Sequence, residues 1–186
     1  MGCGMTCSSE VLRPEAARLW RGAINVLLLA GARSWAGEQK LSPAPEVVGP
    51  VRQRAHIAVR ALAGRERSLQ PLVAKVCELV ADARWRPTEA AVMRYRRGGG
   101  ISTHRDHRRF VYAVAVVCLD GEGVFSTFAS RPGRAVSEWR CRPGDVVVLA
   151  GPDPADPLGV DPRPLHAVRP AGAERVSLTF RMELAS

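Results

Sequence analysis

The sequence predicts an α+β protein in which helices come first and a β-sandwich or barrel follows, and three observations support this. In residues 14–84, apolar side chains recur every three or four positions, as on a helix buried on one side. After residue 89 the period falls to two, and short apolar runs alternate with turn sequences. No helical stretch separates these runs, which favours a sandwich or barrel over a parallel sheet.

Three helices are expected in the first half of the chain. The first starts at Pro14, a good first helical residue, and continues to Leu29. Residues 37–50 contain several Pro and Gly and are predicted to be a connector. A second helix is predicted over Val51–Leu62 and a third over Ser68–Arg84.

Strands are expected throughout the second half, separated by Gly- and Pro-rich turns. Their predicted bounds are residues 90–95, 110–119, 123–128, 135–141, 145–150, 166–169 and 175–182. We therefore expect a helical N-terminal region over residues 1–88 and a β core over residues 89–186, together forming one compact domain.

The composition is that of a globular protein, with 46% hydrophobic and 24% charged residues. The formal charge of +9 has two open interpretations, a basic surface for nucleic acid or an anionic substrate, and a coding bias toward arginine. The five cysteines form no paired CxxC motifs, which argues against a zinc ribbon. No apolar run could cross a membrane and no signal segment is recognisable, so we expect a cytoplasmic protein without a membrane partner.

His104-Arg105-Asp106 is the candidate metal motif. Residues i and i+2 of an extended segment point to the same side, so one imidazole and one carboxylate lie together. His166, at the start of a late predicted strand, can supply a third ligand. Two histidines and one carboxylate on one face of an octahedral metal leave the opposite face open, as in non-haem Fe(II) oxygenases.

The strand after His166 suggests an anion site. Its polar residues, Arg175, Ser177, Thr179 and Arg181, alternate with apolar ones and should share a face. Arginines that line a barrel interior are costly unless an anion pairs with them, and a dicarboxylate suits a guanidinium well. The alternative is an edge strand with a solvated charged face.

In this order the motifs resemble the Fe(II)/2-oxoglutarate dioxygenases: His104-Arg105-Asp106, then His166, then Arg175-Val176-Ser177. The resemblance covers about residues 90–184. It implies a double-stranded β-helix core, of the jelly-roll or cupin-like kind, with the N-terminal helices packed on it. It also implies Fe(II) bound by His104, Asp106 and His166, with 2-oxoglutarate and O2 as cosubstrates. Arg175 and Ser177 would hold the distal carboxylate of 2-oxoglutarate.

Within that superfamily the motifs are closest to the AlkB-like branch. There a second arginine and a tyrosine also contact the cosubstrate, which points to Arg181 and Tyr95. Two positions differ from that branch: Met93 replaces an asparagine, and Arg108 replaces an acidic residue that reads the damaged base. The resemblance implies that 2-oxoglutarate is decarboxylated to succinate and CO2 while a C–H bond of the substrate is oxidised.

Three functions remain open. The first is an oxygenase for a small, anionic or amino-acid-like molecule, with Arg105, His107 and Arg108 as candidate substrate residues. The second is an AlkB-like oxidative demethylase of alkylated DNA or RNA, which the basic charge favours. The third is a cupin-like module that binds a metal without turnover. Succinate production would exclude the third.

Overall fold

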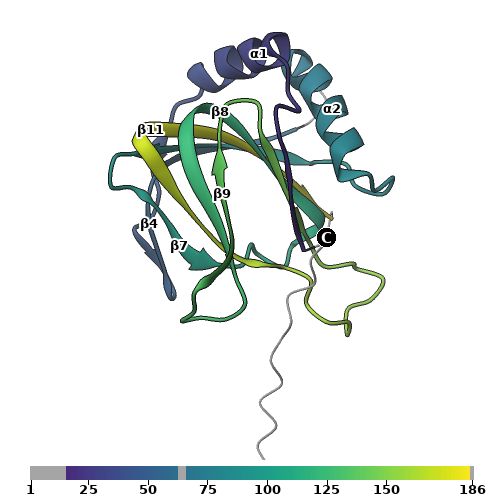
Figure 1. The fold of residues 1–186 in the computed structure, drawn as a ribbon. Helices are drawn as coiled ribbons and strands as arrows, with labels where there is room; N and C mark the ends of the chain where they lie inside the picture. The colour runs from purple at the N-terminus through teal and green to yellow at the C-terminus, as the bar shows by residue number, and fades with distance from the viewer. Residues whose placement is uncertain (1–15, 63–65, 185–186) are drawn as a thin grey trace, which may run out of the picture.

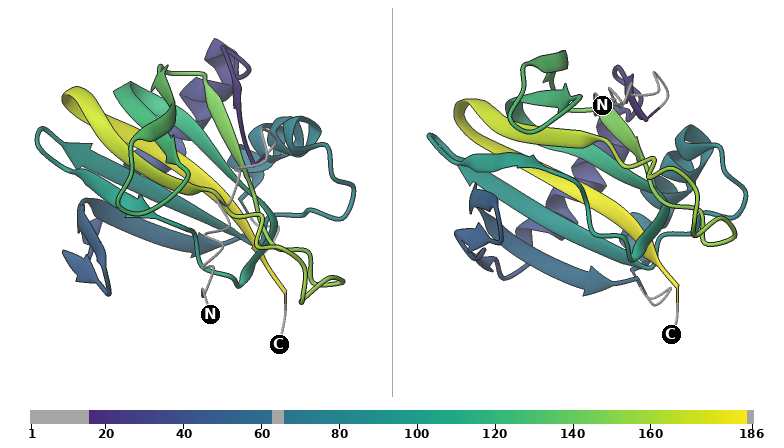
Figure 2. Two further views of the ribbon diagram at one scale, coloured as in Figure 1. Left: turned by 60° about the horizontal axis from the view of Figure 1, so that its bottom comes forward. Right: turned by 90° about the horizontal axis from the view of Figure 1, so that it is seen from below.

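The computed structural model describes residues 16–62 and 66–184. Their strands form a continuous antiparallel sheet that folds over on itself into two facing layers (Figures 1 and 2). Two α-helices, α1 (Val26–Gly37) and α2 (Gln70–Val80), cover the outer face of one layer. No helix among the described residues is long and apolar enough to span a membrane.

Two long strands, β8 (Phe110–Phe128) and β11 (Leu165–Glu183), connect the layers. They pair with each other along their lengths, with the register shifting where they pass from one layer into the other. Each layer is therefore built around the same two strands.

The layer beneath the helices contains one half of β8 and of β11 together with five further strands. In spatial order it runs β1 (Ala17–Trp20), β10 (Val146–Ala150), β8, β11, β6 (Glu89–Arg96), β5 (His56–Ala61) and β2 (Ser42–Pro43). The facing layer contains the other halves, flanked by β9 (Ala135–Cys141) on β8 and by β7 (Gly100–His104) on β11. It continues into β4 (Val51–Arg54) and β3 (Val47–Val48).

Strand β11 is buried on both faces in its second half. Val176, Leu178 and Phe180 pack into the core between sheet and helices. The alternate positions, Arg175, Ser177 and Thr179, are buried as well, and their side chains line the pocket between the layers. The predicted separation of apolar and polar faces is therefore present, but neither face is solvated.

Most of the predicted elements occur. Every predicted strand of the second half lies within an observed one, except that the predicted strand from residue 145 begins at Val146. The third predicted helix corresponds to α2, preceded by the short 3-10 helix η1 (Arg67–Leu69), with Pro71 in its first turn. It ends at Val80 because Ala81 is left-handed (φ 57°), well before Pro87.

The helix predicted over Val51–Leu62 is wrong, because this segment forms β4 and β5. In so short an apolar pattern, a strand and a helix are hard to distinguish by period. The pairing partners decide: β5 lies against β6 over its whole length, and β4 lies against β7. The N-terminal half is thus not wholly helical, and the sheet continues across residue 88.

The first predicted helix is misplaced. Its start at Pro14 lies outside the described residues, and Ala17–Trp20 is the edge strand β1, which pairs with β10. Gly22 (φ 55°) then makes the turn that a side chain would strain. Helix α1 starts only after Asn25, whose side-chain oxygen accepts a hydrogen bond from the Leu28 amide at 3.0 Å. It continues to Gly37, where the predicted connector begins.

Strand β5 offers a test of this corrected architecture. Ala58 is 5% exposed and the adjacent Val59 is 41% exposed, as expected for neighbours on opposite faces of a strand. We expect Ala58→Asp to lower the free energy of unfolding by roughly 3 kcal/mol or more, because it buries an unpaired charge. Val59→Asp should cost about 1 kcal/mol or less. Urea unfolding of both variants measures the difference, and equal costs would contradict the assignment of β5.

Candidate functional site

The three candidate metal ligands come together at one end of the facing layer. His104 is the last residue of β7, Asp106 follows two residues later, and His166 lies near the start of β11. His104 and His166 are cross-strand partners, with ring centroids 4.2 Å apart. One ligand atom from each of the three residues lies within 4.8 Å of the others, and His166 Nε2 is 3.8 Å from Asp106 Oδ2.

Both imidazoles are oriented by the backbone. His104 Nδ1 lies 2.9 Å from the Ser102 carbonyl oxygen, and His166 Nδ1 lies 3.1 Å from that of Pro164. If each Nδ1 carries the proton and donates it there, each Nε2 keeps its lone pair for a metal. Phe125 also stacks on the His166 ring, at 5.2 Å and 6°. Side-chain packing thus helps to hold the ligand ring in place.

His104 is suited to the neutral form that a metal requires. Burial, and then the neighbouring His166, lower the pKa of His104 to about 4, against a smaller opposing effect of Asp106. At neutral pH the imidazole is therefore uncharged. Two imidazole nitrogens and one carboxylate are the donor set of a facial triad for Fe(II).

Arg175 lies in the same pocket and has no counter-charge of its own. It is 2% exposed, yet among the described residues no carboxylate lies within ion-pair distance of it. Its Nη1 donates a hydrogen bond to Ser177 Oγ at 3.3 Å, and its Nε has no partner. A buried, incompletely satisfied guanidinium is costly, so this position suits an anionic ligand.

Tyr95 and Gly123 shape the surroundings of Arg175. The guanidinium carbon lies 5.9 Å from the centre of the Tyr95 ring, and burial raises the pKa of Tyr95 to about 12. A Cβ on Gly123 would lie 2.2 Å from Arg175 Cδ and 2.5 Å from its Nε. A glycine at position 123 therefore leaves the space through which the Arg175 side chain passes across β8.

Arg181, the second predicted arginine, lines the pocket but has a partner in the chain. Its Nε lies 2.5 Å from Glu89 Oε1, in ionic contact without hydrogen-bond geometry, and its guanidinium stacks 4.4 Å above the Phe110 ring. Burial lowers the pKa of Arg181, and Glu89 opposes that effect. A contact between Arg181 and a cosubstrate remains a prediction.

All seven of the predicted metal and cosubstrate residues line one pocket of about 320 Å³. Of the three predicted substrate residues, Arg105 and His107 also line it. Arg108 does not: its side chain is 68% exposed, lies 3.7 Å from Asp161, and borders a separate cavity beside the 151–161 loop. The apolar residues of the pocket lining include Ile57 and Met93, which lie beside Ser177 in the same layer.

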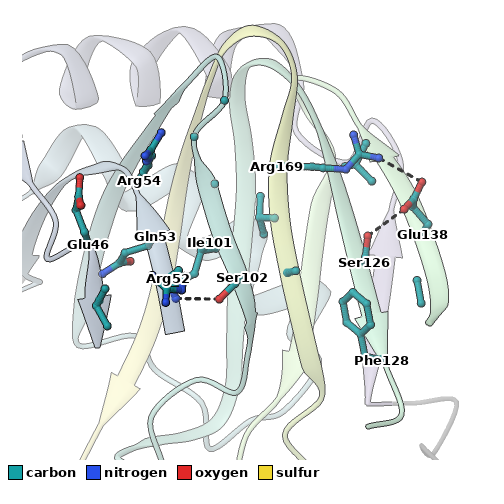
Figure 3. Close-up of a pocket in the computed structure, with 18 residues that line it drawn as sticks. Glu46, Arg52, Gln53, Arg54, Ile101, Ser102, Ser126, Phe128, Glu138 and Arg169 are labelled. Atoms are coloured by element: carbon teal, nitrogen blue, oxygen red, sulfur yellow. Dashed lines mark hydrogen bonds and ion pairs between the residues drawn. The ribbon is translucent and has the colours of Figure 1, made fainter. Parts of the chain in front are cut away.

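A further cavity of about 560 Å³ contains none of the three metal-ligand candidates. Figure 3 shows Arg52 and Arg54 on one wall and Glu138 and Arg169 on the other. Arg169 and Glu138 face each other at 3.7 Å, and Glu138 also accepts a hydrogen bond from Ser126. None of the buried, unpartnered polar atoms of the described residues belongs to its lining.

The structure adds site residues that the sequence analysis missed. Gln53 and Ile57 reach the pocket from β4 and β5, which were predicted to be helical. Gly123 supports Arg175, and its only sequence signal is a glycine inside an apolar strand pattern. Arg163, in the loop before β11, donates a hydrogen bond to the backbone oxygen of Asp106, and the sequence analysis singled out no residue of this loop.

No protein-family model matches the chain, and no curated protein matches its sequence. Solved structures do match in three dimensions. A prolyl-4-hydroxylase from Pseudomonas putida aligns with a TM-score of 0.61 at 18% identity, over 91% of this chain and 93% of that one. A 2OG-Fe(II) oxygenase family oxidoreductase from Burkholderia pseudomallei gives 0.62 at 14% identity, over 91% and 86%.

The structure named OsALKBH1 aligns with a TM-score of 0.58 at 13% identity, over 92% of this chain and 99% of that one. At these identities the likeness concerns the fold, and it confirms the predicted α+β architecture with helices packed on a double-stranded β-helix. The chain therefore has the fold found in the Fe(II)/2-oxoglutarate oxygenases.

Proposed function

We propose that the protein is an Fe(II)- and 2-oxoglutarate-dependent oxygenase that oxidises a C–H bond of a small molecule and releases succinate and CO2. One observation carries the proposal: a histidine–aspartate–histidine group and a buried arginine without a counter-charge share one pocket. The first fits a divalent metal, and the second fits a carboxylate. The fold shared with known oxygenases of this kind adds support.

The residues present fit both groups. His104, Asp106 and His166 would hold Fe(II) from one side and leave the other coordination positions open. Arg175, with Ser177 beside it, would hold the distal carboxylate of 2-oxoglutarate, because a guanidinium donates two parallel hydrogen bonds to a carboxylate. When bound, iron with 2-oxoglutarate and O2 supplies the oxidising power that no side chain has.

The protein's own contribution is orientation and the exclusion of water. The two backbone carbonyls beside His104 and His166 set the ring orientations before any metal arrives. Tyr95, Ser177 and Arg175 are all at most 2% exposed, so a carboxylate placed there would exchange water for fixed donors. Because these groups are ordered before the ligand arrives, less conformational entropy is lost when the carboxylate binds.

The substrate we propose is small and anionic or amino-acid-like. The pocket of about 320 Å³ must also hold 2-oxoglutarate, which leaves room for a group of modest size. Ile57 and Met93 would contact an apolar part of the substrate, and Arg105 and His107 are placed to attract a negative charge. Because Arg108 lies outside this pocket, its predicted substrate role has no geometric support.

The second candidate is oxidative demethylation of alkylated nucleic acid. The formal charge of +9 and the fold shared with OsALKBH1 favour it. Such an enzyme must hold a flipped or single-stranded base by stacking and by contacts to its edge. The phenylalanines that line the metal pocket are already engaged, because Phe110 stacks with Arg181 and Phe125 stacks on His166. We therefore keep the small molecule as the first choice.

The metal assignment is tested by His166→Ala. We expect it to abolish 2-oxoglutarate turnover and to weaken Fe(II) or Co(II) binding strongly, because one of three ligands is lost. The control is His56→Ala, since His56 lies on β5 and is not one of the residues that line the pocket. Succinate release and a Co(II) titration are the measurements, and a fully active His166→Ala protein would refute the assignment.

Arg175→Leu tests the cosubstrate site. Loss of the guanidinium leaves a carboxylate desolvated and unpaired, which should cost about 3–5 kcal/mol of 2-oxoglutarate binding. The measurement is titration of the charge-transfer band of the Fe(II) complex. Arg169→Leu, an exposed position of the same strand, is the matched control. Unchanged affinity in Arg175→Leu would show that another group binds the carboxylate.

The same site can be perturbed without removing a polar group. In Gly123→Ala the added methyl must displace Arg175, and we expect 2-oxoglutarate affinity to fall on the order of 10-fold or more. Gly172→Ala is the control, because a Cβ there meets no atom within 4 Å. Equal affinities in the two variants would mean that the position of Arg175 is irrelevant to the cosubstrate.

Succinate release separates the substrate classes. We expect turnover above the uncoupled background with small carboxylate-bearing molecules, and little with oligonucleotides that carry N1-methyladenine or N3-methylcytosine. Stoichiometric demethylation of such an oligonucleotide would place the nucleic-acid function first. Metal and 2-oxoglutarate binding without succinate from any substrate tested would favour a non-catalytic module.

A further inference from the structure

We propose that Arg163 is a positioning residue for the metal group: its guanidinium clamps the segment that carries Asp106 to the segment that carries His166. The inference rests on the proposed function for the identity of the metal. The clamp itself is a feature of the polypeptide and can be measured without any metal.

Asp106 is the one candidate ligand without support from a strand. His104 ends β7 and His166 belongs to β11, so pairing between these strands fixes both histidines. Asp106 lies in the irregular segment 105–109, where no ladder hydrogen bonds hold the backbone. A carboxylate on such a segment needs another restraint if it is to stay in ligand geometry.

Arg163 supplies that restraint. Its Nη1 donates a hydrogen bond to the backbone oxygen of Asp106, while its Nε and Nη2 donate to Oδ1 and Oδ2 of Asp161 at 2.8 and 2.6 Å. The Arg163 side chain is only 13% exposed. Three directed hydrogen bonds from a shielded, planar group leave it little freedom to move.

The connection runs in both directions. The backbone oxygen of Arg163 accepts a hydrogen bond from Arg105 Nε at 2.9 Å, so each segment holds the other. Arg163 lies between Pro162 and Pro164, whose φ angles are restricted by their rings. Pro164 in turn places its carbonyl oxygen 3.1 Å from His166 Nδ1. The loop before β11 therefore connects Asp106 and His166 through a few stiff residues.

The charge of Arg163 is neutralised within the clamp. The guanidinium, through its hydrogen bonds, lowers the pKa of Asp161 to about 2, which keeps that carboxylate ionised at neutral pH. A cation close to a metal site would otherwise oppose metal binding. Asp161 thus allows an arginine to fix the Asp106 backbone with little electrostatic cost to a bound dication.

The test compares Arg163→Met with Arg108→Met. Both remove a guanidinium that lies near Asp161, but the Arg108 side chain is 68% exposed and its ion pair with Asp161 is longer, at 3.7 Å. Co(II) binding is measured by titration, with the d–d absorption of the bound ion as the signal. We expect its dissociation constant to rise by roughly 10- to 100-fold in Arg163→Met. In Arg108→Met it should stay within about 2-fold of the wild type, well below the roughly 10- to 100-fold change expected when a partner that orients a metal ligand is lost.

Hydrogen exchange on the metal-free protein gives an independent readout. The amides of residues 105–109 should exchange faster in Arg163→Met and at the wild-type rate in Arg108→Met. If the wild-type protein binds no Co(II), the proposed function is refuted, and the clamp is then tested by the hydrogen-exchange rates alone. Wild-type exchange in this segment of a folded Arg163→Met protein would overturn the inference, as would wild-type Co(II) affinity.

Arg163→Lys covers the case in which Arg163→Met does not fold. An ammonium keeps the charge but cannot reach both acceptors with the geometry of a guanidinium. We expect a Co(II) affinity between those of the wild type and Arg163→Met, with a melting temperature close to the wild-type value. Wild-type Co(II) affinity and exchange rates in Arg163→Lys would show that charge alone matters and would contradict the clamp.

Discussion

The burial of β11 on both faces is the constraint on which the rest of the structure depends. One face of the strand, with Val176, Leu178 and Phe180, packs against the helix-side core. The strand alternation then forces Arg175, Ser177 and Thr179 into the space between the layers, where water cannot satisfy them. The apolar core and the polar pocket are thus two consequences of a single strand, and a change of register by one residue would exchange them.

The charged groups of the pocket are only partly paired with one another. Arg105, Arg175 and Arg181 line it together with one carboxylate, Asp106, and Glu89 lies beside it against Arg181. Arg181 and Glu89 pair directly, whereas Arg175 and Asp106 make no ion pair with each other. Under the proposed function, a dication beside Asp106 and a dianion beside Arg175 enter together and leave the net charge unchanged. In a low-dielectric site, binding of the dication would therefore make binding of the dianion more favourable, and the reverse.

The irregular segments around the pocket have a different role from the strands. Paired strands place His104 and His166, but Asp106 and the loop before β11 lie outside the ladders. Their backbone groups need side-chain partners instead, and Arg163 and Arg105 provide them. The irregular part of the site is thereby connected to its paired strands through hydrogen bonds between side chain and backbone. In the same way, Asp145 anchors the turn before α1 by accepting from the Gly22 amide at 2.9 Å.

The sequence by itself determined which segments of the second half alternate with a period of two and which residues could act as metal or anion ligands. These are local properties: the spacing of His104 and Asp106, or of Arg175 and Ser177, sets a side-chain direction within one segment. Only the tertiary structure decided that Val51–Leu62 pairs as strands, that Arg108 turns away from the pocket, and that Gly123 makes room for Arg175. These outcomes depend on contacts between segments far apart in the chain. Such contacts arise from the pairing and close packing of distant segments, which the pattern of one segment alone does not specify.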